Sequence, residues 1–187
     1  MSREISFHPA DLTRHYQKEL WEIFLDTFYV ATSYSEIEEH IARYKYESKR
    51  EYVDIFVDLL AKLGDKYKIF SSKESLLVPV PMHWSRYFSR WFDHTGLIVD
   101  LLSKRETIPY RKILSTQWAK HQSKLSREKR LENKKNRFTM KNHILVPETV
   151  ILFDDIISTW STANECAKVL KAWGVKKVIG IFLASNF

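Results

Sequence analysis

The stretch Val150–Thr162, VILFDDIISTWST, decides the fold class of this 187-residue chain. Its apolar start belongs to Thr149–Phe153, TVILF, which has the composition of a buried strand and runs directly into an Asp-Asp pair. Residues 163–173 then carry apolar side chains at helical spacing, and Lys177–Ala184, KVIGIFLA, is a second apolar strand. Strand, loop, helix and strand form a βαβ unit, so the sequence predicts an α/β fold with a mainly parallel central sheet flanked by helices.

Upstream of this unit the texture of the sequence changes near residue 70. Apolar side chains recur at helical spacing over residues 12–27, 34–44 and 52–63. Leu76–Val80, LLVPV, is instead a short apolar run that predicts another buried strand. We therefore expect a mostly helical N-terminal segment over residues 1–70 and a sheet-bearing part over residues 71–187.

The residues after the TVILF strand suit a phosphorylated sugar. In open α/β sheets, ligands bind outside the carboxyl ends of the strands, and a following helix offers free backbone N–H groups and a positive dipole end. Asp154 and Asp155 would face sugar hydroxyls or a metal, and four hydroxyls are available for a phosphate: Ser158, Thr159, Ser161 and Thr162. The alternative is a solvated turn in which Asp155 or Ser158 caps the helix. For the acid pair alone we would favour the solvated turn. The run of hydroxyls makes a binding site for a phosphorylated sugar the better interpretation.

The same stretch resembles the signature of the type I phosphoribosyltransferases, in which four apolar residues, two acids and two apolar residues precede Thr-Thr-Gly and a further Thr. The resemblance implies the type I phosphoribosyltransferase fold and phosphoribosyl pyrophosphate (PRPP) as a substrate, with Mg²⁺ as cofactor. It implies that Asp154 and Asp155 contact the ribose hydroxyls, and that the 5′-phosphate is held by the loop Ser158, Thr159, Trp160, Ser161 and Thr162. The implied activity is transfer of a phosphoribosyl group to a nitrogen acceptor.

Further segments resemble the ComF-like branch of these proteins, which is associated with competence. They are VPVPMH (Val78–His83), SRWFDHTGLI (Ser89–Ile98), QSKLSREKRLENKKNRF (Gln122–Phe138) and RYKY (Arg43–Tyr46), the last resembling a lysine-bearing helix end. The resemblance covers about residues 28–187. It implies that Val80 and Pro81 belong to the pyrophosphate loop and that Lys124, Arg127 and Arg130 hold phosphates.

The sequence departs from this family in its cysteine and glycine content. Cys166 is the single cysteine, so the chain has no internal disulfide and no Cys-based zinc ribbon, with which the family commonly begins. Trp160 and Trp91 stand where the family has glycine, and the chain has only four glycines. Some bacteria read the codon UGA as glycine, whereas the common alternative translation table reads it as tryptophan. We therefore hypothesise that both residues are glycines in the natural protein. The exchange Trp160→Gly is then expected to strengthen PRPP binding, since it lets the backbone approach a phosphate.

The positive charge of the chain is concentrated in residues 119–141. Nine Lys and Arg face two Glu there, which accounts for the whole formal net charge of +7. We expect a flexible cover over the pocket that meets phosphates or a nucleic-acid backbone, although a charge run alone is more often a solvated helix face. The alternative function is therefore that of a non-catalytic module for DNA uptake. The sequence leaves open whether the protein forms a homodimer. With no apolar stretch of about 20 residues and one cysteine, we expect a cytoplasmic protein with no membrane partner.

Overall fold

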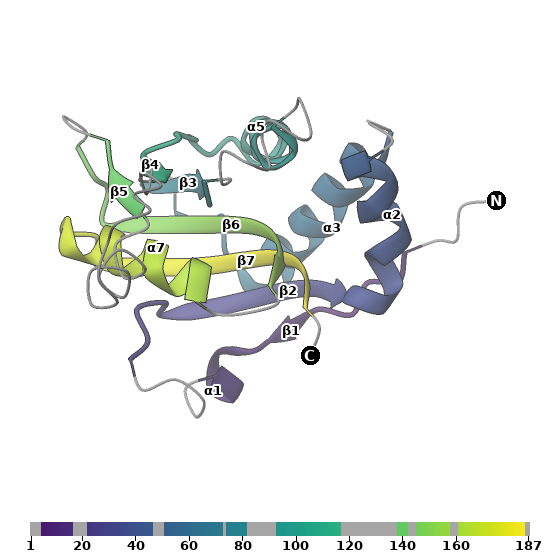
Figure 1. Cartoon of the computed structure of the whole chain (residues 1–187), viewed down its shortest axis with the longest axis horizontal. Helices are drawn as coiled ribbons and strands as arrows, with labels where there is room; N and C mark the ends of the chain where they lie inside the picture. Colours follow the sequence, from purple (N-terminus) through teal and green to yellow (C-terminus); the bar gives the residue numbers. More distant parts are fainter. Residues whose placement is uncertain are drawn as a thin grey trace, which may run out of the picture.

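A five-stranded sheet forms the centre of the computed structural model (Figure 1). The structure describes residues 5–16, 22–46, 51–72, 74–81, 93–116, 138–141, 145–157 and 161–185. The strand order is β1-β2-β7-β6-β3, with bounds Ala10–Asp11 (β1), Thr27–Ser33 (β2), Lys177–Ser185 (β7), Thr149–Ile157 (β6) and Ser75–Pro79 (β3). All neighbours pair in parallel except β1, which is antiparallel to β2. The predicted α/β fold with a mainly parallel sheet is confirmed.

Helices cover both faces of this sheet. The described helices are α1 (Thr13–Tyr16), α2 (Tyr34–Tyr46), α3 (Tyr52–Tyr67), α5 (His94–Glu106) and α7 (Ser161–Ala172). Helix α7 joins β6 to β7, which completes the predicted βαβ unit. A small antiparallel pair, β4 (Leu114–Thr116) and β5 (Phe138–Met140), lies on the same side as α7 and packs into the same apolar cluster.

Strand β6 shows how the alternation of side chains builds two cores. Ile151 and Phe153 are fully buried in a cluster with α3 and α5, whereas Val150 and Leu152 are fully buried in a second cluster with α7. Successive side chains of a strand point to opposite faces, so a strand covered on both sides reads as one continuous apolar run. The run TVILF has this form because neither of its faces meets water.

The expected helix over residues 12–27 is wrong for most of its described length. Helix α1 ends at Tyr16, residues 22–26 are not helical, and Thr27–Ser33 is strand β2. In this strand Phe28 and Val30 point into the α7-side cluster, while Ala31 points into the other. Aromatic and β-branched side chains fit such a pleated surface well. The segment before residue 70 is thus helical in α2 and α3 but also adds two strands, β1 and β2, to the central sheet. A domain boundary near residue 70 stays a prediction.

Helix α3 runs past Gly64 and Asp65. It ends at Tyr67 because Lys68 takes a left-handed conformation, φ 55°, and its backbone N–H bonds to the Gly64 carbonyl. Gly64 is needed for another reason: a Cβ there would overlap the ring of Phe70. The glycine therefore lets the chain fold back over the last turn of the helix, and Lys68 makes the turn.

Candidate functional site

The Asp154-Asp155 pair lies where strand β6 loses one of its two neighbours. The Val80 N–H donates a hydrogen bond to the Phe153 carbonyl, 2.8 Å, and β3 has already ended at Pro79. Beyond Phe153, β6 continues to Ile157 along β7 only, with Ile156 and Ile157 beside Ala184 and Ser185. The strand therefore extends four residues past the TVILF run, and the two acids lie near its carboxyl end, at the point where its β3 side becomes open within the described residues.

The two carboxylates bond to the backbone at this open edge. Asp154 Oδ1 accepts the N–H of Asp155, 2.9 Å, and Asp155 Oδ1 accepts the N–H of Ile156, 2.8 Å. A buried or half-buried N–H without a hydrogen-bond partner costs free energy, and each carboxylate provides an acceptor for the N–H of the next residue. The bonds also fix the orientation of each carboxylate.

Asp155 points to the side of the sheet that carries α2. Its Oδ2 forms an ion pair with Lys45 Nζ in the last turn of that helix. The Lys45 side chain is only 13% exposed and that of Asp155 only 18%. This is therefore a largely buried pair, unlike the exposed pairs elsewhere on the helices, and it joins two residues far apart in the sequence.

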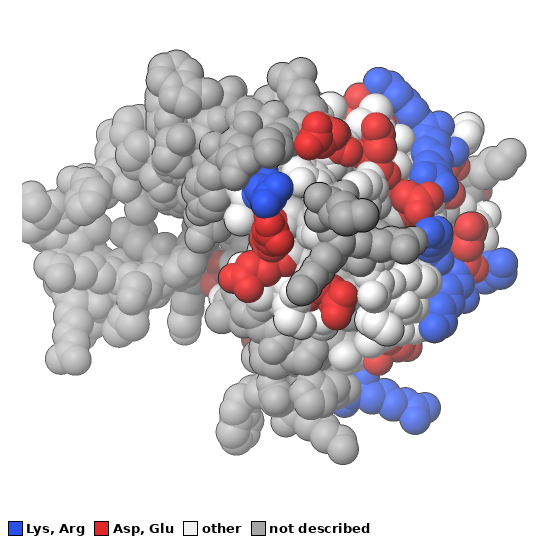
Figure 2. All heavy atoms as spheres, turned by 90° about the vertical axis from the view of Figure 1, so that its right-hand side faces the viewer, with Lys and Arg blue, Asp and Glu red and all other residues white. Residues whose placement is uncertain are grey.

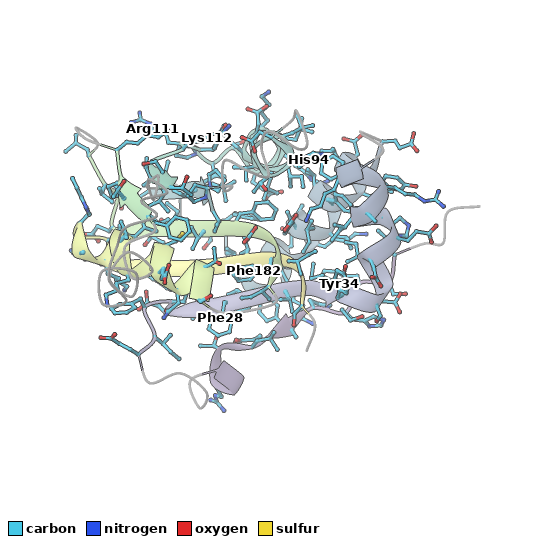
Figure 3. All side chains as sticks on the ribbon, viewed as in Figure 1. Phe28, Tyr34, His94, Arg111, Lys112 and Phe182 are labelled. Atoms are coloured by element: carbon cyan, nitrogen blue, oxygen red, sulfur yellow. The ribbon has the colours of Figure 1, made fainter. Side chains whose placement is uncertain are left out.

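Asp154 points to the other side, towards α7. Burial raises the pKa of the Cys166 thiol well above its ordinary value, and the charges of Asp154 and Glu165 raise it further. The Cys166 thiol is free and buried, and it therefore stays protonated at neutral pH. In β7, Phe182 lies in register with Asp154, and Figure 3 shows Phe182 and Phe28 on neighbouring strands.

Four more of the predicted site residues fall at the same end of the sheet. Val80 and Pro81 directly follow β3, and Ser161 and Thr162 form the first turn of α7, close behind β6 in the chain. The remaining ones lie outside the described residues: Ser158, Thr159, Trp160, Lys124, Arg127 and Arg130, together with Trp91. The structure thus brings the ends of β3 and β6 together. The chemical roles of all these residues stay predictions.

Carboxylates are the groups at this edge that suit a metal. Within the described ranges, no three His, Cys, Asp or Glu side chains are grouped so that they could hold an ion. Mg²⁺ usually takes one or two carboxylates together with substrate phosphates, and does not need a cage made by the protein alone. Asp154 and Asp155 fit that requirement.

Some of the charged side chains of α2 and α3 form ion pairs at the surface. Figure 2 shows Lys and Arg gathered in a band there, with Asp and Glu beside them. Arg43 pairs with Glu39, and both Lys62 and Arg105 pair with Asp58.

Comparisons with known proteins give related sequences, although no family model matches the chain. Competence protein F of Haemophilus influenzae is 33% identical over 108 residues, which cover 54% of this chain and 46% of the relative. Competence protein ComFC of Streptococcus pneumoniae is 28% identical over 150 residues, 76% of this chain and 60% of the relative. Competence protein ComFC of Bacillus subtilis is 23% identical over 148 residues, 78% and 58%. The chain is thus similar in sequence to the ComF competence proteins.

The chain spans about half to three fifths of the length of these relatives. Among the helices that the structure describes, none is sufficiently long and apolar to cross a membrane.

Lys45 was not among the predicted site residues, although it contacts Asp155. It lies within the RYKY segment, whose resemblance to a lysine-bearing helix end was the available signal. Nothing in the local pattern indicated that this lysine meets an aspartate 110 positions later in the chain, because the contact depends on how α2 crosses the sheet.

Proposed function

We propose that this chain binds PRPP with Mg²⁺ and transfers its phosphoribosyl group to a nitrogen acceptor. The observation that supports this best is the Asp154-Asp155 pair at the open end of β6, shortly before the first turn of α7. Carboxylates that accept hydroxyl hydrogens and a helix N-terminus that attracts a phosphate are what a sugar 5-phosphate requires. The single buried cysteine suits a reducing cytoplasm, where we place the protein.

The reaction exchanges one bond at the anomeric carbon of the ribose. The bond to a pyrophosphate oxygen breaks, a bond to the acceptor nitrogen forms, and pyrophosphate leaves with the bonding electrons. Positive charge develops on the sugar, and Asp154 and Asp155 would hold the ribose by its hydroxyls while their negative charge favours that change. Bound Mg²⁺ would supply neutralisation of the pyrophosphate charge. No side chain of the protein has to act as a nucleophile.

A thermal-shift titration with PRPP and Mg²⁺ tests this proposal without a guess about the acceptor. At 100 times the dissociation constant, one-site binding stabilises the folded protein by about 2.7 kcal/mol. The double variant Asp154→Asn with Asp155→Asn should lose most of this stabilisation, since the amide keeps the size of the side chain and removes its charge. The matched control is Asp58→Asn with Asp100→Asn, two exposed acids on α3 and α5, which should keep it. A full shift in the Asp154/Asp155 variant would mean that PRPP binds elsewhere.

A second candidate function is supported by the charge of residues 119–141, where nine Lys and Arg face two Glu. The relatives are named competence proteins, and a basic segment of this kind suits a nucleic-acid backbone taken up during competence. In this case single-stranded DNA should bind with an affinity that falls steeply with salt, by about 0.7 logarithmic units per contacted phosphate and decade of salt. Binding of DNA without any stabilisation by PRPP would favour this candidate over the enzyme.

A further inference from the structure

Helix α2 crosses the carboxyl end of the sheet (Figure 1). It begins at Tyr34, directly after β2 ends at Ser33, and its thirteen residues end at Tyr46. A helix of that length spans about 20 Å, whereas neighbouring strands are about 4.8 Å apart. Helix α2 therefore reaches from the end of β2 past β7 to β6, where its last turn meets Asp155.

The end of α2 is anchored next to this contact. The Tyr44 hydroxyl donates a hydrogen bond to the His94 carbonyl at the start of α5, 2.8 Å, and the Tyr44 side chain is 2% exposed. Its ring packs edge-on against Phe56 and His94, with ring centroids 5.5 and 4.8 Å apart. Lys45 follows in the chain, so the backbone that carries its ammonium group is held by the neighbouring residue.

Both oxygens of the Asp155 carboxylate have a partner from the protein. Oδ1 accepts the Ile156 N–H and Oδ2 accepts from Lys45 Nζ. Two contacts of this kind fix the position and the rotation of a carboxylate, and each oxygen keeps a lone pair that can accept a hydroxyl. A largely buried ion pair is weak evidence for a gain in stability, because both charges lose their hydration. Its placement at the candidate ribose site calls for a functional reason.

We propose that Lys45 is a positioning residue, which holds the Asp155 carboxylate for one hydroxyl of the ribose and so sets selectivity against the deoxy sugar that lacks this hydroxyl. The inference rests on the proposed function, since it assumes that a sugar phosphate binds at Asp154 and Asp155. It adds that the N-terminal segment completes the site, because α2 lies outside the part of the chain over residues 71–187 in which the acids stand.

The test compares three sugars, ribose 5-phosphate, 2-deoxyribose 5-phosphate and 3-deoxyribose 5-phosphate, by calorimetric titration. A hydrogen bond to a charged group changes affinity about ten- to hundredfold, so the wild type should prefer ribose by that factor over both deoxy sugars. This preference gives two affinity ratios, ribose over 2-deoxyribose and ribose over 3-deoxyribose. Asp155→Asn should bring one of these two ratios close to one and thereby identify the hydroxyl that Asp155 binds. Lys45→Met should lower the same ratio to within about threefold of unity and leave the other ratio unchanged. A residue that merely stabilises the fold would not move one ratio alone.

Two further variants make the result specific to Lys45. Lys104→Met removes an exposed lysine that pairs with Asp100 on α5, and both ratios should stay at their wild-type values. Lys45→Arg keeps the positive charge and should restore part of the lost ratio. If Lys45→Met does not fold, Lys45→Arg replaces it, and a small change confined to the Asp155-dependent ratio is then expected.

The outcomes separate this inference from the function on which it rests. A wild type that binds neither PRPP nor ribose 5-phosphate overturns both. A wild type with both preferences, together with Lys45 variants that keep them, overturns the role of Lys45 alone. Equal loss of affinity for ribose 5-phosphate and for inorganic pyrophosphate in Lys45→Met would make Lys45 a phosphate ligand, and would also overturn the positioning role.

Discussion

Asp154 and Asp155 are adjacent in the sequence but have different neighbours in space. Asp155 forms an ion pair with Lys45, whereas Asp154 lies near Glu165 and the buried Cys166 thiol. The difference follows from the alternation of a strand, which sends one side chain to each face of the sheet. The two acids are therefore expected to differ in role, although both belong to one motif.

The Cys166 thiol gives a prediction at the same scale. Burial raises the pKa of the Cys166 thiol in the folded state. Below about pH 8.5 the thiol is protonated in the unfolded chain as well, so its full contribution to the free energy of unfolding is present there. As the pH rises further, the unfolded chain ionises first, so the free energy of unfolding should fall by up to about 1.4 kcal/mol per pH unit. Urea unfolding at pH 7 and pH 10 measures this fall, and Cys166→Ala is the control that should lack it. An identical fall in both proteins would contradict the assignment.

At the scale of the elements, two side chains of helix α7 contact the segment before β2. Asn164 Oδ1 accepts the Phe24 N–H, 2.7 Å, and Asn164 Nδ2 donates to the Glu22 carbonyl, 2.9 Å. Lys171 of the same helix pairs with Asp26, 2.6 Å. Asn164 holds the first turn of α7, where the phosphate loop would end, against the chain that enters the central sheet, and Lys171 holds the last turn.

Removing this tie should lower stability measurably. Each hydrogen bond contributes about 0.5–1.5 kcal/mol, so Asn164→Ala should cost about 1–2 kcal/mol and lower the melting temperature by roughly 2–8 °C. Asn164→Asp keeps the acceptor for Phe24 and loses the donor to Glu22, so about half of that cost is expected. Equal melting temperatures for all three proteins would show that the tie contributes nothing.

The elements also show how far the sequence alone leads. The strands β3, β6 and β7 were predictable because a strand buried on both faces reads as a continuous apolar run. Strand β2, TFYVATS, was not recognised, because its neighbouring residues have apolar side chains at helical spacing and only its place between β1 and β7 makes it a strand. The acid pair followed from its motif, whereas the Lys45 contact depends on the path of α2 and has no local signal.

At the scale of the whole molecule, the central sheet and its cores take residues from both parts of the chain. Strand β2 pairs with β7 from Thr27 to Ser33, although about 150 residues separate them in sequence. In the core cluster on the α3 side, thirteen of twenty-four buried residues come from before residue 71. The part of the chain with the acids therefore lacks more than half of one core when taken alone.

We expect residues 71–187 by themselves not to fold cooperatively, because the α3-side faces of β6 and β7 would be exposed to water together with the unpaired edge of β7. Burial of apolar surface contributes about 25 cal/mol per Å², and the loss of α2, α3 and β2 removes far more than the 5–15 kcal/mol by which a typical domain is stable. Thermal unfolding of this piece should show no sharp transition, and it should bind an apolar dye that the full chain does not bind. Co-expression with residues 1–70 is the control, and it should restore a cooperative transition. A sharp transition of residues 71–187 alone, with the PRPP-dependent shift of the full chain, would instead make residue 70 a true domain boundary and leave Lys45 outside the site.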